Sequence, residues 1–156
     1  DESPRKGESP RAYVARMAAE KAAAVAAVEP GVVLAADTTV VAGRRILGKP
    51  VDAAEAAGFL RLLSGRRHRV MTAVTVMAGG HARHRLVDTV VRLRQLPDAE
   101  IAAYVAGGDW RGKAGGYGIQ GPAGAFVQRI VGSHSSVMGL PVHEAVQLLT
   151  GVGWRP

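Results

Sequence analysis

Asp37 is the one acidic residue in the otherwise apolar or hydroxyl-bearing segment Leu34-Ala35-Ala36-Asp37-Thr38-Thr39. We place this carboxylate at a strand end, where polar groups are often delivered to a cleft and where it could hold a divalent cation or activate water. A capping or turn aspartate is the alternative, since a carboxylate is costly to bury without a partner. Lys49 ends the hairpin expected to follow, and its ammonium either meets a phosphate or stays solvated.

A glycine-rich stretch runs from residue 112 to 124. It holds more glycine than a packed helix or strand tolerates, which indicates either backbone close to a ligand or a strained loop. Neither the Walker order of residues nor a dinucleotide-binding fingerprint is present. Gln120 in this stretch either reads the edge of a base or is an ordinary loop amide.

Two further groups of residues give weaker signals. The basic cluster at residues 64–69 could bind phosphate or RNA, although a solvated strand end explains it as well. The five histidines show no spacing that demands zinc, and no Ser/His/Asp arrangement can be assigned.

The composition limits the class of protein. A chain of 156 residues with 47% hydrophobic and 21% charged residues is typical of one soluble domain, and no apolar run is long enough to span a bilayer. The absence of cysteine excludes disulfides and thiolate metal sites, so a metal must be bound by oxygen or imidazole. The N-terminal residues lack the apolar core of a secretory signal, and we expect a cytoplasmic protein without membrane partners.

The formal charge of +7 indicates an anionic partner. A nucleic-acid backbone and a small phosphorylated substrate fit this charge equally well. Because only 4% of the residues are aromatic, single-stranded nucleic acid is the less favoured of the two.

Hydrophobic periodicity predicts an α/β order of elements with hairpins. The segment 70–77 is apolar on both of its faces and should be a central strand, and 83–94 should form a hairpin with it. Ser9-Pro10 and Asp52-x-x-Glu55 are helix-start signals. The expected helices cover residues 12–28, 53–63, 98–107 and 140–149, and the other strands cover 32–36, 38–41, 46–47 and 126–130.

The order of these motifs along the chain resembles the Maf family of nucleoside triphosphate pyrophosphatases. The matching pieces are Asp1-Glu2 with Glu8-Ser9-Pro10, Ala19-Glu20-Lys21-Ala22, Ala36-Asp37-Thr38, Gly48-Lys49-Pro50-Val51-Asp52, Leu63-Ser64-Gly65-Arg66 with His68 and Thr72, Lys113-Ala114-Gly115 with Tyr117-Gly118-Ile119-Gln120-Gly121, and Gly139-Leu140-Pro141. The resemblance implies an elongated mixed sheet with two lobes flanking a cleft, as in the inosine triphosphate pyrophosphatases. It also implies a homodimer and a requirement for Mg²⁺ or Mn²⁺.

The resemblance further implies roles for individual residues. Asp37 would be the proton acceptor, and Glu2 would hold the metal with it. Lys21 and Lys49 would contact phosphates, with Lys49 in the catalytic group. The remaining substrate-binding residues would be Thr38, Gln120, Arg66 and Lys113, of which Thr38 and Gln120 mark the subgroup that acts on dTTP and UTP.

The family pattern begins with a strand and a Ser-x-Ser-Pro-Arg-Arg loop that would precede Asp1. We therefore expect residues 1–156 to form a single, N-terminally incomplete Maf-like domain. The expected activity is hydrolysis of a nucleoside triphosphate, dTTP or UTP, to the monophosphate and pyrophosphate. A non-catalytic regulator of cell division that binds nucleotide or nucleic acid is the alternative.

Overall fold

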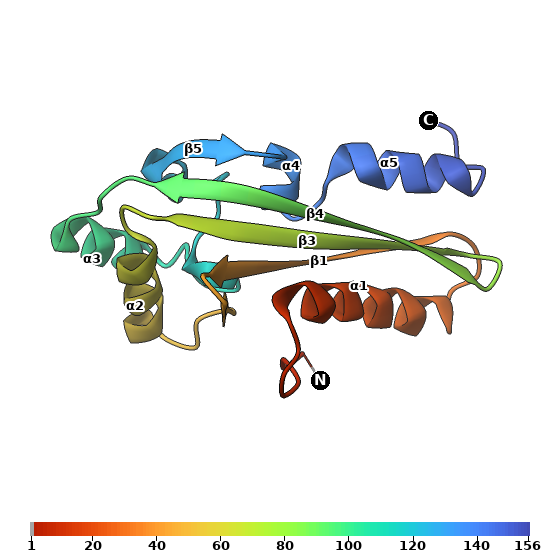
Figure 1. Ribbon diagram of the computed structural model, residues 1–156, viewed down its shortest axis with the longest axis horizontal. Coiled ribbons are helices and arrows are strands. Elements are labelled where there is room, and N and C mark those ends of the chain that lie inside the picture. The colour runs from red at the N-terminus through yellow and green to blue at the C-terminus, as the bar shows by residue number, and fades with distance from the viewer. Residues whose placement is uncertain (1) are drawn as a thin grey trace.

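A computed structural model describes residues 2–156, so Asp1 of the matched Asp1-Glu2 pair lies outside the described residues. One sheet carries helices at both of its ends and on both of its faces (Figure 1). The helices are α1 (Pro10–Ala26), α2 (Ala53–Leu63), α3 (Asp98–Gly107), α4 (His134–Val137) and α5 (Val142–Gly151), with the 3-10 turns η1 (Ala114–Gly116) and η2 (Pro122–Phe126). The strands are β1 (Val33–Ala42), β2 (Arg45–Leu47), β3 (Arg67–Ala78), β4 (His81–Leu93) and β5 (Val127–Val131).

The strands lie in the order β2-β1-β3-β4-β5, and all four pairings are antiparallel. The α/β class and the elongated sheet are confirmed, but within residues 2–156 the sheet is antiparallel where we expected mixed strand directions. The hairpin between β3 and β4 turns through Gly79 and Gly80, whose φ angles of 56° and 79° fit a two-residue turn with both central residues left-handed. This turn sets β3 and β4 side by side over their whole length.

Local signals begin the helices as the sequence predicts. The Ser9 side chain accepts a hydrogen bond from the Ala12 amide, and Pro10 stands at the first position of α1. At α2, Asp52 Oδ1 accepts from the Glu55 amide at 2.8 Å while the Glu55 carboxylate accepts from the Val51 amide. These side chains satisfy amides that have no partner within the first helical turn.

Both faces of β3 are buried, which confirms its predicted central place. Met71 and Ala73 pack with Val14 and Ala18 of α1 on one face. On the other face, Val74 and Val76 pack against α5, and Val70 belongs to the large cluster beneath α2, α3 and the loop after α3. The helices at the two ends of the molecule are therefore fastened to the same strand (Figure 1).

Two predicted boundaries are wrong. Asp37 lies in the middle of β1 rather than at a strand end, because the ladder with β3 runs from Val33 to Val41 without a break. The last helix begins at Val142 rather than Leu140, since Pro141 stands immediately before its first residue.

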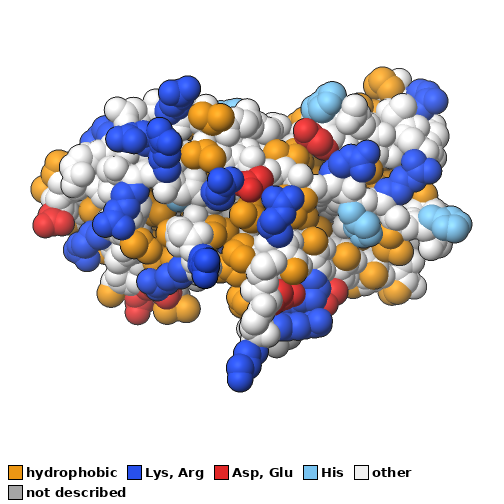
Figure 2. Space-filling view, in the orientation of Figure 1, with side chains coloured by type: hydrophobic (Ala, Val, Ile, Leu, Met, Phe, Trp, Pro, Cys, Tyr) orange, Lys and Arg blue, Asp and Glu red, His pale blue; other side chains and the backbone are white. Residues whose placement is uncertain are grey.

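No helix among residues 2–156 is long and apolar enough to cross a bilayer. On the face shown in Figure 2, Lys and Arg side chains gather most densely over the left half, where β5 and the adjoining ends of β3 and β4 lie. The excess of positive charge is thus visible on the surface.

Candidate active site

The side chain of Asp37 lies on the face of β1 that α1 covers, where the Lys21 ammonium forms an ion pair with it. The Asp37 side chain is only 14% exposed, and that of Lys21 is 39% exposed. Partial burial lowers the pKa of Lys21, but the Asp37 and Glu2 carboxylates together raise the pKa by more, so the net shift is upward. A positive charge is therefore fixed beside the Asp37 carboxylate.

Glu2 and Lys49 complete this arrangement. Glu2 Oε1 is 3.5 Å from Lys21 Nζ, and Glu2 Oε2 is 4.0 Å from Lys49 Nζ. The hydroxyl of Tyr13 on α1 donates to the Glu2 carbonyl oxygen at 2.8 Å and holds this part of the chain near the strand. We call Glu2, Lys21, Asp37 and Lys49 the charged cluster; the structure brings together four residues that the sequence analysis had assigned to one site.

Two hollows adjoin along β1. The charged hollow, of about 320 Å³, is bordered by Glu2, Tyr13 and Lys49. The loop hollow, of about 240 Å³, extends from Lys49 to the glycine-rich stretch and is lined by residues including Thr38, Lys113, Tyr117, Gln120 and Met138. Asp37, Thr38, Lys49 and Ala114 line both hollows.

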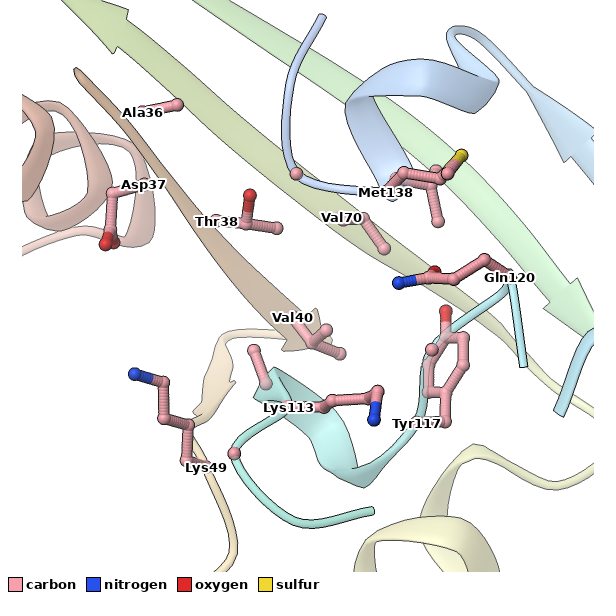
Figure 3. A pocket seen from close by; sticks show the side chains of 15 residues that line it. Ala36, Asp37, Thr38, Val40, Lys49, Val70, Lys113, Tyr117, Gln120 and Met138 are labelled. Atoms are coloured by element: carbon pink, nitrogen blue, oxygen red, sulfur yellow. The ribbon is translucent and has the colours of Figure 1, made fainter. Parts of the chain in front are cut away.

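The alternation of β1 separates the two chemistries. Asp37 and Thr38 are consecutive strand residues, so their side chains lie on opposite faces. Figure 3 shows Thr38, Tyr117 and Gln120 on one side of β1 and Asp37 on the other. Charged groups are thus gathered on one side of the strand and neutral hydrogen-bonding groups on the other.

A close contact of the backbone holds the glycine-rich stretch against β1. The Gly115 amide donates to the Gly48 carbonyl at 3.0 Å, which joins this stretch to the loop that carries Lys49. Gly115 has a φ of 70°, and a Cβ there would lie 2.9 Å from both methyl groups of Val40. Only glycine fits this position without displacing Val40, so the glycine content reflects close packing against the site.

Lys113 and Arg66 differ in their placement. Lys113 lines the loop hollow, although its ammonium donates to the Asp109 carbonyl at 2.5 Å and lies 3.4 Å from Asp109 Oδ1. Arg66 borders neither hollow; it lies with Arg61 and Gln95 around a separate depression. The structure therefore does not bring Arg66 together with the other predicted residues.

The Thr38 hydroxyl lies 2.9 Å from that of Thr72, and the Thr72 hydroxyl donates to the Ser136 carbonyl at 2.8 Å. On the far side of the hollow, Tyr117 Oη is 2.5 Å from Nε2 of His68, a histidine that is 3% exposed. The sequence analysis did not assign Tyr117 to the site, although it flagged the stretch that contains it.

Oxygen ligands for a divalent metal are present but few. Among residues 2–156 no group of three or more Asp, Glu, His or Cys side chains could hold a metal. Glu2 and Asp37 do face a common cation, the Lys21 ammonium. Two carboxylates suit Mg²⁺, which usually keeps several waters and takes substrate phosphates as further ligands.

Comparisons with known proteins agree with this geometry. The family model described as Maf-like protein matches residues 1–152. The dTTP/UTP pyrophosphatase of Roseobacter denitrificans is 57% identical over 155 residues, which cover 99% of this chain and 82% of that protein. Proteins of the same name from Cereibacter sphaeroides and Caulobacter vibrioides are 58% and 53% identical, over 98% and 100% of this chain and 80% and 82% of their own lengths.

Proposed function

The chain belongs to the Maf family, and from this premise we propose that it hydrolyses a nucleoside triphosphate, dTTP or UTP, to the nucleoside monophosphate and pyrophosphate. The observation that carries the proposal is the charged cluster, which sets two carboxylates and two ammonium groups beside a hollow lined by neutral hydrogen-bonding groups. The triphosphate would bind at the charged hollow and the base in the loop hollow.

Hydrolysis adds the oxygen of water to the α-phosphorus and breaks its bond to the oxygen that bridges the α and β phosphates. Asp37 is the residue we assign to orient this water and to accept its proton. Lys21 and Lys49 offset the negative charge that builds on the phosphates and on the leaving pyrophosphate. The ion pair with Lys21 fixes the orientation of the Asp37 carboxylate.

We further propose that Glu2 and Asp37 hold a divalent cation, Mg²⁺ or Mn²⁺. Such an ion, when bound, neutralises phosphate charge and polarises the phosphoryl oxygens. The supporting observation is the pair of carboxylates that face one cation from two parts of the chain. Lys113 would contact the substrate from the loop side, and the protein would act as a homodimer in the cytoplasm, where its nucleotide substrates are found.

Pyrophosphate release from dTTP, UTP, CTP and a methylated GTP, with Mg²⁺ or Mn²⁺, tests the proposal. We expect Asp37→Asn to lower turnover by about 10²- to 10⁴-fold, the usual contribution of a positioned general base. Asp98→Asn is the matched control, because Asp98 has a side chain that is 89% exposed and lies at neither hollow.

Release by the parent and by Asp98→Asn, but not by Asp37→Asn, supports the enzyme. If the parent binds these nucleotides and releases no pyrophosphate, the proposal fails and the non-catalytic regulator is favoured.

A further inference from the structure

The direction of the Thr38 hydroxyl proton follows from its buried neighbours. The single proton of the Thr72 hydroxyl is donated to the Ser136 carbonyl, and Thr72 and Ser136 are both 0% exposed. The short contact between the two threonine hydroxyls therefore requires Thr38 to donate to Thr72. Thr38 Oγ1 is then left with its lone pairs toward the loop hollow, where it can act only as an acceptor.

The Tyr117 hydroxyl is set by a buried histidine in the opposite sense. His68 is 3% exposed, and its Nδ1 has no hydrogen-bond partner among residues 2–156. A proton on Nδ1 would leave a buried N–H unpaired, which is rarer in proteins than an unpaired acceptor. The proton therefore belongs on Nε2, which donates to Tyr117 Oη.

Burial keeps both members of this pair neutral near pH 7. It lowers the pKa of His68 to about 4 and raises the pKa of Tyr117 above its usual value. The neutral tyrosine retains its own proton, and within the described chain its hydroxyl has no second hydrogen-bond partner. That proton is free to be donated to a group in the loop hollow, which Tyr117 lines together with Thr38 and Gln120 (Figure 3).

We propose that Tyr117 and Thr38 form a donor and acceptor pair that reads the imide edge of uracil or thymine, with His68 and Thr72 as the positioning residues that fix the two proton directions. The proposal rests on the proposed function and assigns its base specificity. Uracil and thymine present a carbonyl next to an N–H, which match a donor and an acceptor. The Gln120 amide, which carries both kinds of group, can serve the adjoining carbonyl.

Cytosine reverses this pattern. It has an amino group in place of the carbonyl and a lone pair in place of the N–H. Each contact would then set donor against donor or acceptor against acceptor. A buried site that leaves its own polar groups unpaired rejects the wrong base strongly, so we expect the parent to prefer UTP over CTP by about 100-fold or more in kcat/KM.

The test compares kcat/KM for UTP and CTP in two variants and a control. Tyr117→Phe removes the donor and should lower kcat/KM for UTP about tenfold while CTP changes little. Thr72→Val frees the Thr38 hydroxyl to turn and donate, so kcat/KM for CTP should rise. Tyr104→Phe removes a hydroxyl that bonds Asp109 and the Gly116 carbonyl outside the hollow, and it should leave the ratio of UTP to CTP unchanged.

Two results would overturn the inference. One is a ratio that stays within about twofold of the parent in both Tyr117→Phe and Thr72→Val. The other is ¹⁵N NMR of the parent showing the His68 proton on Nδ1, a measurement that needs no substrate and no variant.

Failure of the proposed function would look different. The parent would then release no pyrophosphate from any nucleotide. Calorimetric binding of UMP and CMP to the same proteins would still test the base preference, with UMP the tighter ligand if the inference holds and equal affinity refuting it.

Discussion

Replacing Gly115 with alanine should destabilise the protein by more than its backbone conformation alone explains. An alanine at a φ of 70° costs roughly 1–2 kcal/mol relative to glycine. Its Cβ would also lie 2.9 Å from both methyl groups of Val40, a β-branched side chain that is 3% exposed and cannot turn away freely. Overpacking of this kind adds roughly 1–3 kcal/mol, so the total expected loss is about 2–5 kcal/mol.

Gly112→Ala is the matched control. Gly112 lies in the same stretch with a φ of 72°, but a Cβ there would meet nothing within 4 Å. The control should therefore lose only the backbone cost, and the gain from a less flexible unfolded chain is the same in both variants. Urea unfolding should place Gly115→Ala about 1–3 kcal/mol below Gly112→Ala.

A double-mutant cycle locates the clash. Adding Val40→Ala should recover part of the loss in Gly115→Ala but none in Gly112→Ala. Equal destabilisation by the two glycine variants, or no coupling between Gly115 and Val40, would refute the argument that close packing against β1 demands glycine here.

Three further outcomes are expected. Chelation by EDTA should abolish pyrophosphate release, and Mg²⁺ or Mn²⁺ should restore it; full activity without metal would contradict the roles assigned to Glu2 and Asp37. Burial lowers the pKa of His68 from the ordinary histidine value of 6.5 to about 4, so the stability present above pH 6.5 should fall, by on the order of 3 kcal/mol, as the pH drops to 4. Urea unfolding of His68→Gln should lack this part of the slope. Asp52→Ala should cost about 1 kcal/mol through loss of the α2 cap, and an unchanged midpoint would show that the cap is dispensable.

Elements with local determinants could be predicted from the sequence. The starts of α1 and α2 depend on side chains within three residues of the helix, and the hairpin at Gly79 and Gly80 depends on two adjacent residues. The apolar faces of β3 likewise follow from its own alternation. Each of these signals acts over a short stretch of chain, so no knowledge of distant partners was needed.

The position of Asp37 could not be predicted in this way. Whether Asp37 ends a strand or stands within one depends on how far β1 pairs with β3, and that register is set by residues more than thirty positions away. The Asp37, Lys21, Glu2 and Lys49 assignments came from family resemblance, and the structure shows that these side chains meet. For Tyr117 the missing information was its contact with His68, which no local pattern announces.

The shared attachment of both ends to β3 has a consequence for motion. Strand β3 runs for 12 residues and β4 for 13, and the packing on β3 reaches from α2 and α3 to α1 and α5 without a linker between them. No hinge is available within residues 2–156 about which one end could swing toward the other, because bending would break the β3–β4 ladder. Ligands must therefore enter a preformed groove, and we expect free and bound backbones to differ by less than about 1 Å, as in other pre-organised complexes.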